Sequence, residues 1–123
     1  MSHDRRVATG PFRALTEGER ARVTVLLAAD FPGNEALRRQ LGHAKVRSID
    51  TDGSLQFSIG EGPIADVIRR VPVEGESADS DGAVVHLLLH VLGGMLSELD
   101  IYREDSLAVR RIPEAGDMKA VVF

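Results

Sequence analysis

Cysteine and tryptophan are both absent from this chain of 123 residues. Without cysteine, the protein has no disulfide framework, no thiolate nucleophile and no sulfur-ligated metal. A chain of this length can nevertheless bury a core large enough to fold without cross-links. Its 43% hydrophobic and 28% charged residues match the composition of soluble globular proteins. The totals therefore predict one folded domain.

Long apolar runs are also absent. No stretch approaches the roughly 18 consecutive apolar residues that a membrane-spanning helix requires. The chain starts with Met-Ser-His-Asp-Arg-Arg, and no apolar run of the kind found in signal peptides follows these polar residues. We therefore expect a cytoplasmic protein with no membrane partner.

Aromatic residues are scarce, at 4% of the chain, and the net charge is −4. Domains that bind nucleic acids combine a basic surface with aromatic side chains that stack on bases. We therefore expect no nucleic-acid partner. Arginines 20, 22, 38 and 39 could form a local basic patch, but a solvated face or a salt-bridged contact is the simpler explanation.

Charge is unevenly distributed along the chain. Residues 1–48 carry a net charge of +4, whereas residues 49–123 carry −8. Two halves of opposite sign favour self-association or a charged partner. The alternative is that both halves present ordinary solvated faces.

Two helices are predicted near the start of the chain. Thr16 and Glu19 have the spacing of a capping box, and apolar residues then recur every three or four positions until Phe31-Pro32-Gly33. This predicts a helix over 16–30. A second, short helix should follow with Asn34 as its N-cap and Gly42 as its left-handed terminator.

Alternating residues predict strands in the rest of the chain. Residues 54–59 alternate strictly between polar and apolar, and an Asp-Gly turn joins them to a partner strand at 46–49. Residues 64–73 are ambiguous: an apolar stripe favours a helix, but Val71-Pro72-Val73 favours an extended edge. We prefer a strand over 67–76.

The clearest hairpin joins Val84–Leu92 to Met95–Tyr102 through Gly93-Gly94. Both strands are nearly continuous in apolar residues, which suits central positions covered on both faces. We expect the helices on one face and a second subunit of a homodimer on the other. The fold class is α+β, with two N-terminal helices followed by an antiparallel β-meander of about five strands.

The expected domain organisation has three parts. Residues 1–14 are polar, basic and interrupted by Gly10-Pro11, which predicts a flexible N-terminal arm. Residues 15–113 form the single α+β domain. Residues 114–123 form a tail whose apolar end either docks on the domain or frays.

His86 and His90 are candidate metal ligands or catalytic residues on this hairpin. On a strand His86 and His90 share a face, but they lie roughly 13 Å apart, too far to share one ion. A two-residue turn would place His90 opposite Ser97 and His86 opposite Ile101. A Ser–His contact is a recurring catalytic arrangement, and it would suggest a small hydrolase or isomerase.

Nearby acids do not complete such a site at this register. Glu98 and Asp100 would point to the opposite face, with Leu87 and Leu89 across from them, so nothing would orient the imidazole. Carboxylates on an apolar face would need water or an arginine such as Arg103. The sequence thus predicts no catalytic set.

Metal and cofactor motifs are incomplete as well. Residues 77–82 resemble the start of a calcium loop, but the twelfth position, which requires glutamate, is Leu88. An Asp-Gly turn explains this segment. No phosphate-binding glycine motif stands at a strand-to-helix junction. We expect no metal and no cofactor.

Four segments resemble a family of small uncharacterised bacterial proteins, mostly actinobacterial. They are Asp30–Gly33, Val71–Glu74, Asp79–Gly82 and Leu96–Tyr102. The resemblance extends from about Leu15 to Pro113. Similar sequences often have an Asp-Gly turn in place of Gly93-Gly94, which supports the hairpin. The family implies no activity that could be transferred to this chain.

The leading hypothesis is a non-enzymatic binding or protein-interaction module of unknown ligand that forms a homodimer and has no nucleic-acid or membrane partner. The alternatives are a small hydrolase or isomerase around His90 and Ser97, and an immunity or antitoxin-like partner of another protein. The candidate ligand- or partner-binding residues lie on the terminal hairpin: His86, His90, Ser97, Glu98, Asp100 and Tyr102.

Overall fold

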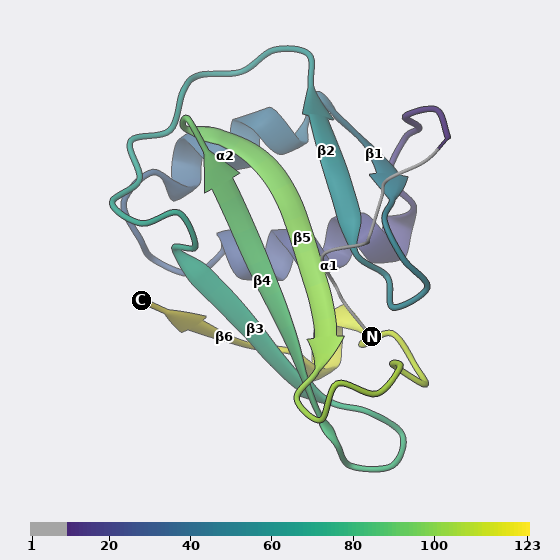
Figure 1. Cartoon of the computed structure of the whole chain (residues 1–123). Coiled ribbons are helices and arrows are strands. Elements are labelled where there is room, and N and C mark those ends of the chain that lie inside the picture. Colours follow the sequence, from purple (N-terminus) through teal and green to yellow (C-terminus); the bar gives the residue numbers. More distant parts are fainter. Residues whose placement is uncertain (1–9) are drawn as a thin grey trace.

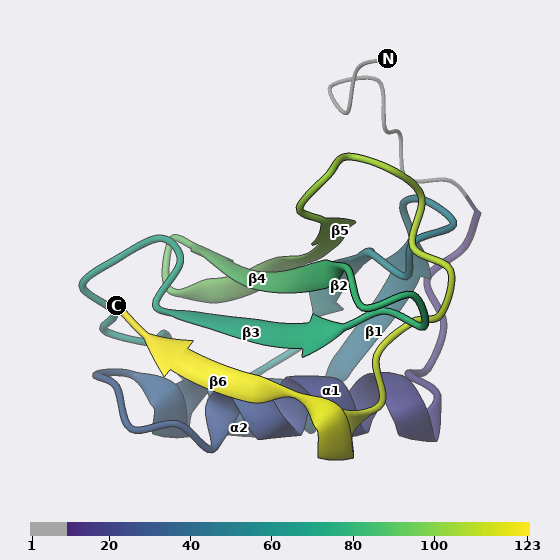
Figure 2. The ribbon, with the colours of Figure 1, turned by 90° about the horizontal axis from the view of Figure 1, so that it is seen from below.

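A computed structural model describes residues 10–123 and shows two layers. Helices α1 (Glu17–Leu27) and α2 (Asn34–Leu41) lie against one face of a six-stranded antiparallel sheet (Figures 1 and 2). This confirms the α+β class, with two helices preceding the strands. Within residues 10–123, no helix has the length and apolar character needed to cross a membrane.

The sheet order is β1-β2-β5-β4-β3-β6. Its strands are β1 (Ala44–Ser48), β2 (Leu55–Ile59), β3 (Val73–Ala78), β4 (Val84–Leu92), β5 (Met95–Arg103) and β6 (Lys119–Val122). Only β3, β4 and β5 form a meander. The β1–β2 hairpin joins the sheet along β5, and the C-terminal tail returns as the sixth strand beside β3 (Figure 1).

Helix α1 begins as the sequence predicts. The Thr16 hydroxyl accepts a hydrogen bond from the Glu19 N–H at 3.2 Å, and the Glu19 carboxylate accepts one from the Thr16 N–H at 2.8 Å. The apolar stripe of Val23, Leu26 and Leu27 is buried against the sheet. The helix ends at Leu27, three residues earlier than predicted.

Side chains from α2 satisfy the end of α1. Asn34 Nδ2 donates to the Ala29 carbonyl at 2.9 Å, and Arg38 Nε donates to the Leu27 carbonyl at 3.0 Å. Asn34 therefore caps the preceding helix, and the prediction that it is the N-cap of α2 is wrong. That position is taken by Gly33 at φ +93°.

The predicted left-handed end of α2 is also wrong. Gly42 has φ −61° and ψ −21°, which is right-handed geometry. The chain instead makes one more turn, in which the His43 N–H donates to the Gln40 carbonyl at 2.9 Å, and then enters β1 directly. No reversal of backbone handedness is needed because the strand starts two residues after Gly42.

The β1–β2 hairpin is confirmed, with Val46 opposite Phe57. Its turn is closed by Asp50, whose Oδ1 accepts from the N–H groups of Asp52 and Ser54. On the outer side of β1, Arg13 forms a β-bridge with Val46 through two backbone hydrogen bonds of 2.8 Å. Part of the arm predicted over 1–14 thus lies on the sheet edge, while residues 1–9 fall outside the described residues.

Residues 60–72 form an irregular connection, so the strand predicted over 67–76 begins only at Val73. Neither reading of the ambiguous segment, helix or strand, is correct. The backbone of this loop bonds instead to the β4–β5 hairpin: the Ala65 N–H donates to the Gly94 carbonyl at 2.9 Å, and the Val91 N–H donates to the Arg70 carbonyl at 2.7 Å. These hydrogen bonds to the hairpin take the place of the regular backbone hydrogen bonds that a helix or a strand would form.

The β4–β5 hairpin is confirmed, and within residues 10–123 the two helices cover one of its faces. Odd-numbered residues of β4 are buried against the helices, whereas His86, Leu88 and His90 are half-buried on the other face. The second face is therefore less apolar than predicted, and its coverage by a second subunit stays a prediction. Burial alternates along β4 with a period of two residues, although the strand looks almost continuously apolar. Histidines stand at two of the three outward positions between Val85 and Val91.

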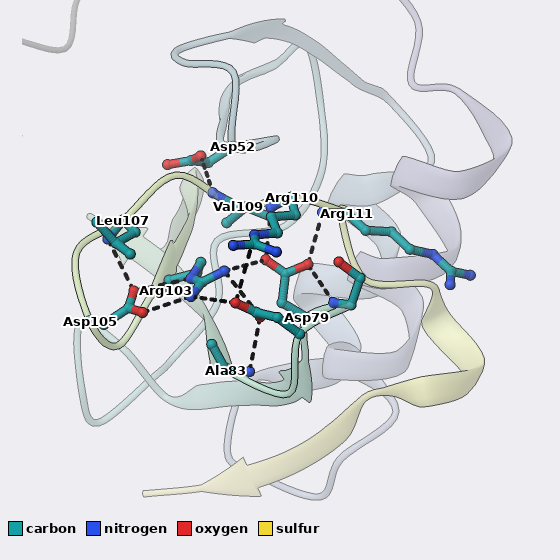
Figure 3. Close-up of polar contacts among 11 residues, drawn as sticks. Asp52, Asp79, Ala83, Arg103, Asp105, Leu107, Val109, Arg110 and Arg111 are labelled. Atoms are coloured by element: carbon teal, nitrogen blue, oxygen red, sulfur yellow. Dashed lines mark hydrogen bonds and ion pairs between the residues drawn. The ribbon is translucent and has the colours of Figure 1, made fainter.

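A buried ionic cluster joins the turns at one end of the sheet (Figure 3). Arg103, at the end of β5, is 3% exposed. Its guanidinium donates to Asp105 at 2.7 and 3.0 Å, to Asp81 at 3.1 Å and to Asp79 at 3.2 Å. Arg103, one of the partners suggested for Glu98 and Asp100, thus pairs with these three aspartates instead. The turn expected at 79–82 is confirmed, and its aspartates surround a guanidinium.

Asp79 accepts four hydrogen bonds in this cluster. Oδ1 receives the N–H groups of Ser80 (2.7 Å) and Arg111 (2.9 Å), and Oδ2 receives the N–H of Arg110 (2.7 Å) and Arg103 Nη1. Burial alone would raise the pKa of Asp79, but these bonds outweigh it and lower the pKa to about 2. The carboxylate thereby fixes the loop that follows β5 (Figure 3).

Candidate functional site

A β-bulge at Ser97 decides which side chains meet on the β4–β5 hairpin. Next to the turn, Leu92 pairs with Met95 and Val91 with Leu96, as a two-residue turn requires. The register then shifts by one residue, so that His90 pairs with Glu98. Ser97 is the extra residue of the bulge, and the prediction that it stands opposite His90 is wrong.

The shift moves the acids of β5 to the histidine face. Glu98 lies opposite His90, Asp100 opposite Leu88, and Tyr102 opposite His86. The prediction that Glu98 and Asp100 share the other face with leucines is therefore wrong, because a change of one residue in register reverses the face of every following side chain. Leu87 and Leu89 pair instead with Ile101 and Leu99, on the helix side.

The surface formed in this way is called the open face below. It is the side of β3, β4 and β5 that lies away from α1 and α2 (Figure 2). Five of the six candidate residues occupy it: His86, His90, Glu98, Asp100 and Tyr102. All five are half-buried. The structure therefore brings together on one surface most of the residues that the sequence indicated.

The first cluster on the open face consists of His90, Glu98 and Asp100. One ligand atom from each, an imidazole nitrogen or a carboxylate oxygen, lies within 4.8 Å of the other two. The Nδ1 atom of His90 is buried and has no hydrogen-bond partner among the described residues. These three groups could together hold a cation.

The second cluster surrounds His86. Its Nδ1 contacts a Glu74 carboxylate oxygen, and its Nε2 lies 2.9 Å from Glu104 Oε1. Burial by itself would lower the pKa of His86, but the two carboxylates stabilise the imidazolium and the pKa is raised. The ring stacks on Tyr102, with centroids 5.2 Å apart. His86 thus has a partner at each nitrogen.

The pKa of Tyr102 is raised as well. Burial is the main cause of its raised pKa, and the negative charges of Glu74, Asp100 and Glu104 add to it. The phenol therefore stays protonated and remains a hydrogen-bond donor. It adds an aromatic ring to an acidic surface.

Sequence reasoning missed the contribution of β3. Glu74 and Glu76 lie on the open face beside β4, where Glu76 pairs with His86 and Glu74 with Leu88. Glu74, Glu76 and His86 form a second set of potential ligand atoms within 4.8 Å of one another. The alternation in Val73-Glu74-Gly75-Glu76 was a signal for two acids on one face, but the neighbouring strand could not be identified from it.

Two hollows in the surface bear on where a ligand could bind. One of about 250 Å³ adjoins the end of β5 and is lined by Asp100, Tyr102, Arg103, Glu104 and Ser106. A larger one of about 680 Å³ lies between the α1–α2 turn and the loop after β2, and its lining includes Asp30, Glu35 and Arg39. Neither sheet histidine lines either hollow. The two histidines therefore belong to the broad surface of the sheet and not to either of these two hollows.

Three of the four helix arginines donate hydrogen bonds to backbone carbonyls. Arg20 donates to the Leu41 carbonyl at 3.1 Å, Arg22 donates to the Pro113 carbonyl, and Arg38 caps α1. These guanidinium groups satisfy backbone carbonyls and tie the helices to neighbouring segments.

Comparison with known proteins gives one match. Searches of the curated proteins and of the solved structures each found no significant similarity. A family profile described as a domain of unknown function, DUF6984, matches residues 12–113. This range nearly coincides with the resemblance at 15–113 that the sequence motifs indicated, and it includes both helices, β1 to β5 and the open face. The chain therefore belongs to the DUF6984 family of domains of unknown function.

Proposed function

We propose that this protein is a non-enzymatic interaction module that binds a basic segment of a protein partner on its open face. One observation carries the proposal: the carboxylates of Glu74, Glu98, Asp100 and Glu104 gather around two imidazoles and Tyr102 on one side of the sheet. An uneven charge distribution, with net −8 over residues 49–123, supports it.

The chemistry of these groups suits arginine in particular. A carboxylate accepts two parallel hydrogen bonds from a guanidinium, and aromatic rings stack on its flat face. Glu98 and Asp100 supply acceptors, while the stacked His86–Tyr102 pair supplies a flat ring surface nearby. Complementary charge also raises the rate at which a basic partner finds the surface.

An immunity or antitoxin-like role belongs to the same class, because it also requires recognition of another protein. The hydrolase or isomerase alternative has less support. Ser97 occupies the bulge, and Glu98 stands opposite His90 in the place where the proposed nucleophile was expected. The interaction module therefore remains the better proposal.

Binding of a basic peptide tests the proposal. We expect a fluorescently labelled arginine-rich peptide to bind the full chain, and to bind the Glu98→Gln/Asp100→Asn double variant about tenfold more weakly, because the variant lacks two acceptor charges at the contact. The measurement is fluorescence anisotropy at low and at moderate salt. Affinity should fall as salt screens the charges.

A matched control removes two charges from the helix layer. The Glu17→Gln/Glu35→Gln variant changes two exposed glutamates in the first turns of α1 and α2. It loses the same net charge and should bind the peptide like the parent chain. Equal weakening of both double variants would contradict recognition by the open face, since net charge alone would then explain binding.

We also propose that the chain forms a homodimer through the edge strand β6, and not through the face of the β4–β5 hairpin. The edge strand β6 and the residue after it expose Val121, Val122 and Phe123, at 39%, 42% and 55%. An edge strand with exposed apolar side chains favours pairing with a second copy. Light scattering during size-exclusion chromatography should give twice the monomer mass, and Val121→Lys should restore the monomer. A monomeric parent chain at high concentration would refute this proposal.

A cytoplasmic location in a bacterium completes the proposed function. The absence of cysteine is compatible with a reducing compartment and supports this location. The bacterial origin is supported by the motif resemblance at 15–113.

A further inference from the structure

We propose that His90, Glu98 and Asp100 bind one divalent transition-metal ion, with zinc as the best fit. This departs from the sequence prediction of no metal, and it goes beyond recognition of a basic partner. The three residues come from positions on β4 and β5 that the bulge at Ser97 brings face to face. Two independent observations support the proposal, one from geometry and one from hydrogen bonding.

The geometry matches the size of a metal site. Zinc binds imidazole nitrogen and carboxylate oxygen at about 2.0–2.2 Å, so two ligands of one ion lie roughly 3–4.4 Å apart. The potential ligand atoms of His90, Glu98 and Asp100 all lie within 4.8 Å of one another. The paired strands hold the backbone positions.

Hydrogen bonding distinguishes His90 from His86. His86 has a carboxylate at each ring nitrogen, so an ion there would have to displace existing partners. His90 differs, because its Nδ1 is buried without a partner among the described residues. A buried nitrogen without a hydrogen bond is unfavourable, and such a group in a folded protein calls for an explanation such as a bound ion. The His90 cluster is therefore the stronger candidate.

The donor set selects the class of ion. Calcium and magnesium prefer ligand sets made only of oxygen, whereas imidazole favours zinc, copper, iron and nickel. One imidazole with two carboxylates suits zinc, and three protein ligands leave a coordination position open for water or another ligand. The two carboxylates also neutralise the charge of the ion. Zinc is thus the probe for the test.

The test uses the full chain, stripped of metal with a chelator and titrated with zinc chloride by calorimetry. We expect one zinc ion per chain. Loss of an outer-shell partner weakens metal sites by about 10–100-fold, so loss of a direct ligand in His90→Asn or Glu98→Gln should weaken binding at least tenfold. The matched control His43→Gln removes an exposed imidazole that lies outside the open face and should leave zinc affinity unchanged.

A second measurement needs no variant and so does not depend on how the variants fold. In imidazole-selective NMR spectra of the parent chain, zinc should shift the His90 ring signals at the lowest metal ratio. The proposal is overturned if zinc fails to bind at millimolar concentration, if His86 or His43 responds first, or if His90→Asn binds zinc as tightly as the parent chain.

The two proposals for the open face fail separately. His90→Asn removes a metal ligand but keeps the carboxylates, so it should lose zinc and retain the arginine-rich peptide. Zinc binding without peptide binding would refute the proposed partner, whereas peptide binding without zinc binding would refute the metal site. The two titrations are therefore read independently.

Discussion

Replacing Asp79 with asparagine should lower the Tm by roughly 10 °C, because breaking a buried ion pair destabilises proteins by several kilocalories per mole. All four partners of this carboxylate are donors, with two at each oxygen. An asparagine must aim its NH₂ group at two of them, and it also removes the charge that faces Arg103. Thermal unfolding followed by circular dichroism measures the effect.

The acid dependence of stability should change in the same variant. Because the folded-state pKa of Asp79 is lowered from 3.8 to about 2, this carboxylate stabilises the fold above its unfolded pKa. That contribution is lost as the pH falls from about 5 towards 2. Denaturant unfolding across this range should therefore show a shallower loss of stability for Asp79→Asn than for the parent chain.

Asp66→Asn is the matched control, since it makes the same chemical change at an exposed position. Its stability should stay within about 0.5 kcal/mol of the parent chain, as is usual for surface substitutions. The role assigned to the cluster would be refuted if Asp79→Asn unfolded at the same temperature as this control. Part of the acid dependence should persist in Asp79→Asn, because Arg103 also lowers the pKa of Asp105.

Gly94→Ala should be the more damaging of two alanine substitutions in the β4–β5 turn. Gly94 has φ +77°, and a Cβ atom there would overlap Ile64 and lie 2.7 Å from the Ala65 carbonyl oxygen. The left-handed conformation alone is unfavourable for alanine by about 1–2 kcal/mol. The overlap forces the 60–72 loop away from the turn, so we expect a total destabilisation of at least about 3 kcal/mol.

Gly93 provides the control within the same turn. Its φ is +59°, but a Cβ atom there would meet nothing within 4 Å. Gly93→Ala should therefore show only the conformational effect, about 1–2 kcal/mol. Denaturant unfolding of both variants measures the difference. Equal destabilisation would mean that the contact between the turn and the loop contributes nothing to the fold.

Several features of the fold could be predicted from local sequence. The capping box of Thr16 and Glu19, the Asp-Gly turn before β2 and the double glycine between β4 and β5 each depend on residues close in the chain. Local hydrogen bonding and the conformational freedom of glycine decide such features. The α+β class followed from these elements and their order.

Other features depended on contacts between distant segments. Residues 64–71 have both a helical and an extended pattern, and the hydrogen bonds of Ala65 and Arg70 to the β4–β5 hairpin decide against both. Gln40 acts similarly, since its buried side chain donates to the Pro63 and Gly94 carbonyls and accepts from the Leu96 N–H. A short sequence window contains neither partner of such bonds.

The candidate site combines both kinds of information. The sequence by itself determined which residues carry ionisable groups on the terminal hairpin and that His86 and His90 share a face. Only the tertiary structure decided that Glu98 and Asp100 join them, because a one-residue bulge at Ser97 reverses the face of all that follows. A bulge has no reliable local signature, since it arises where the pairing of whole strands is more favourable with one residue left out.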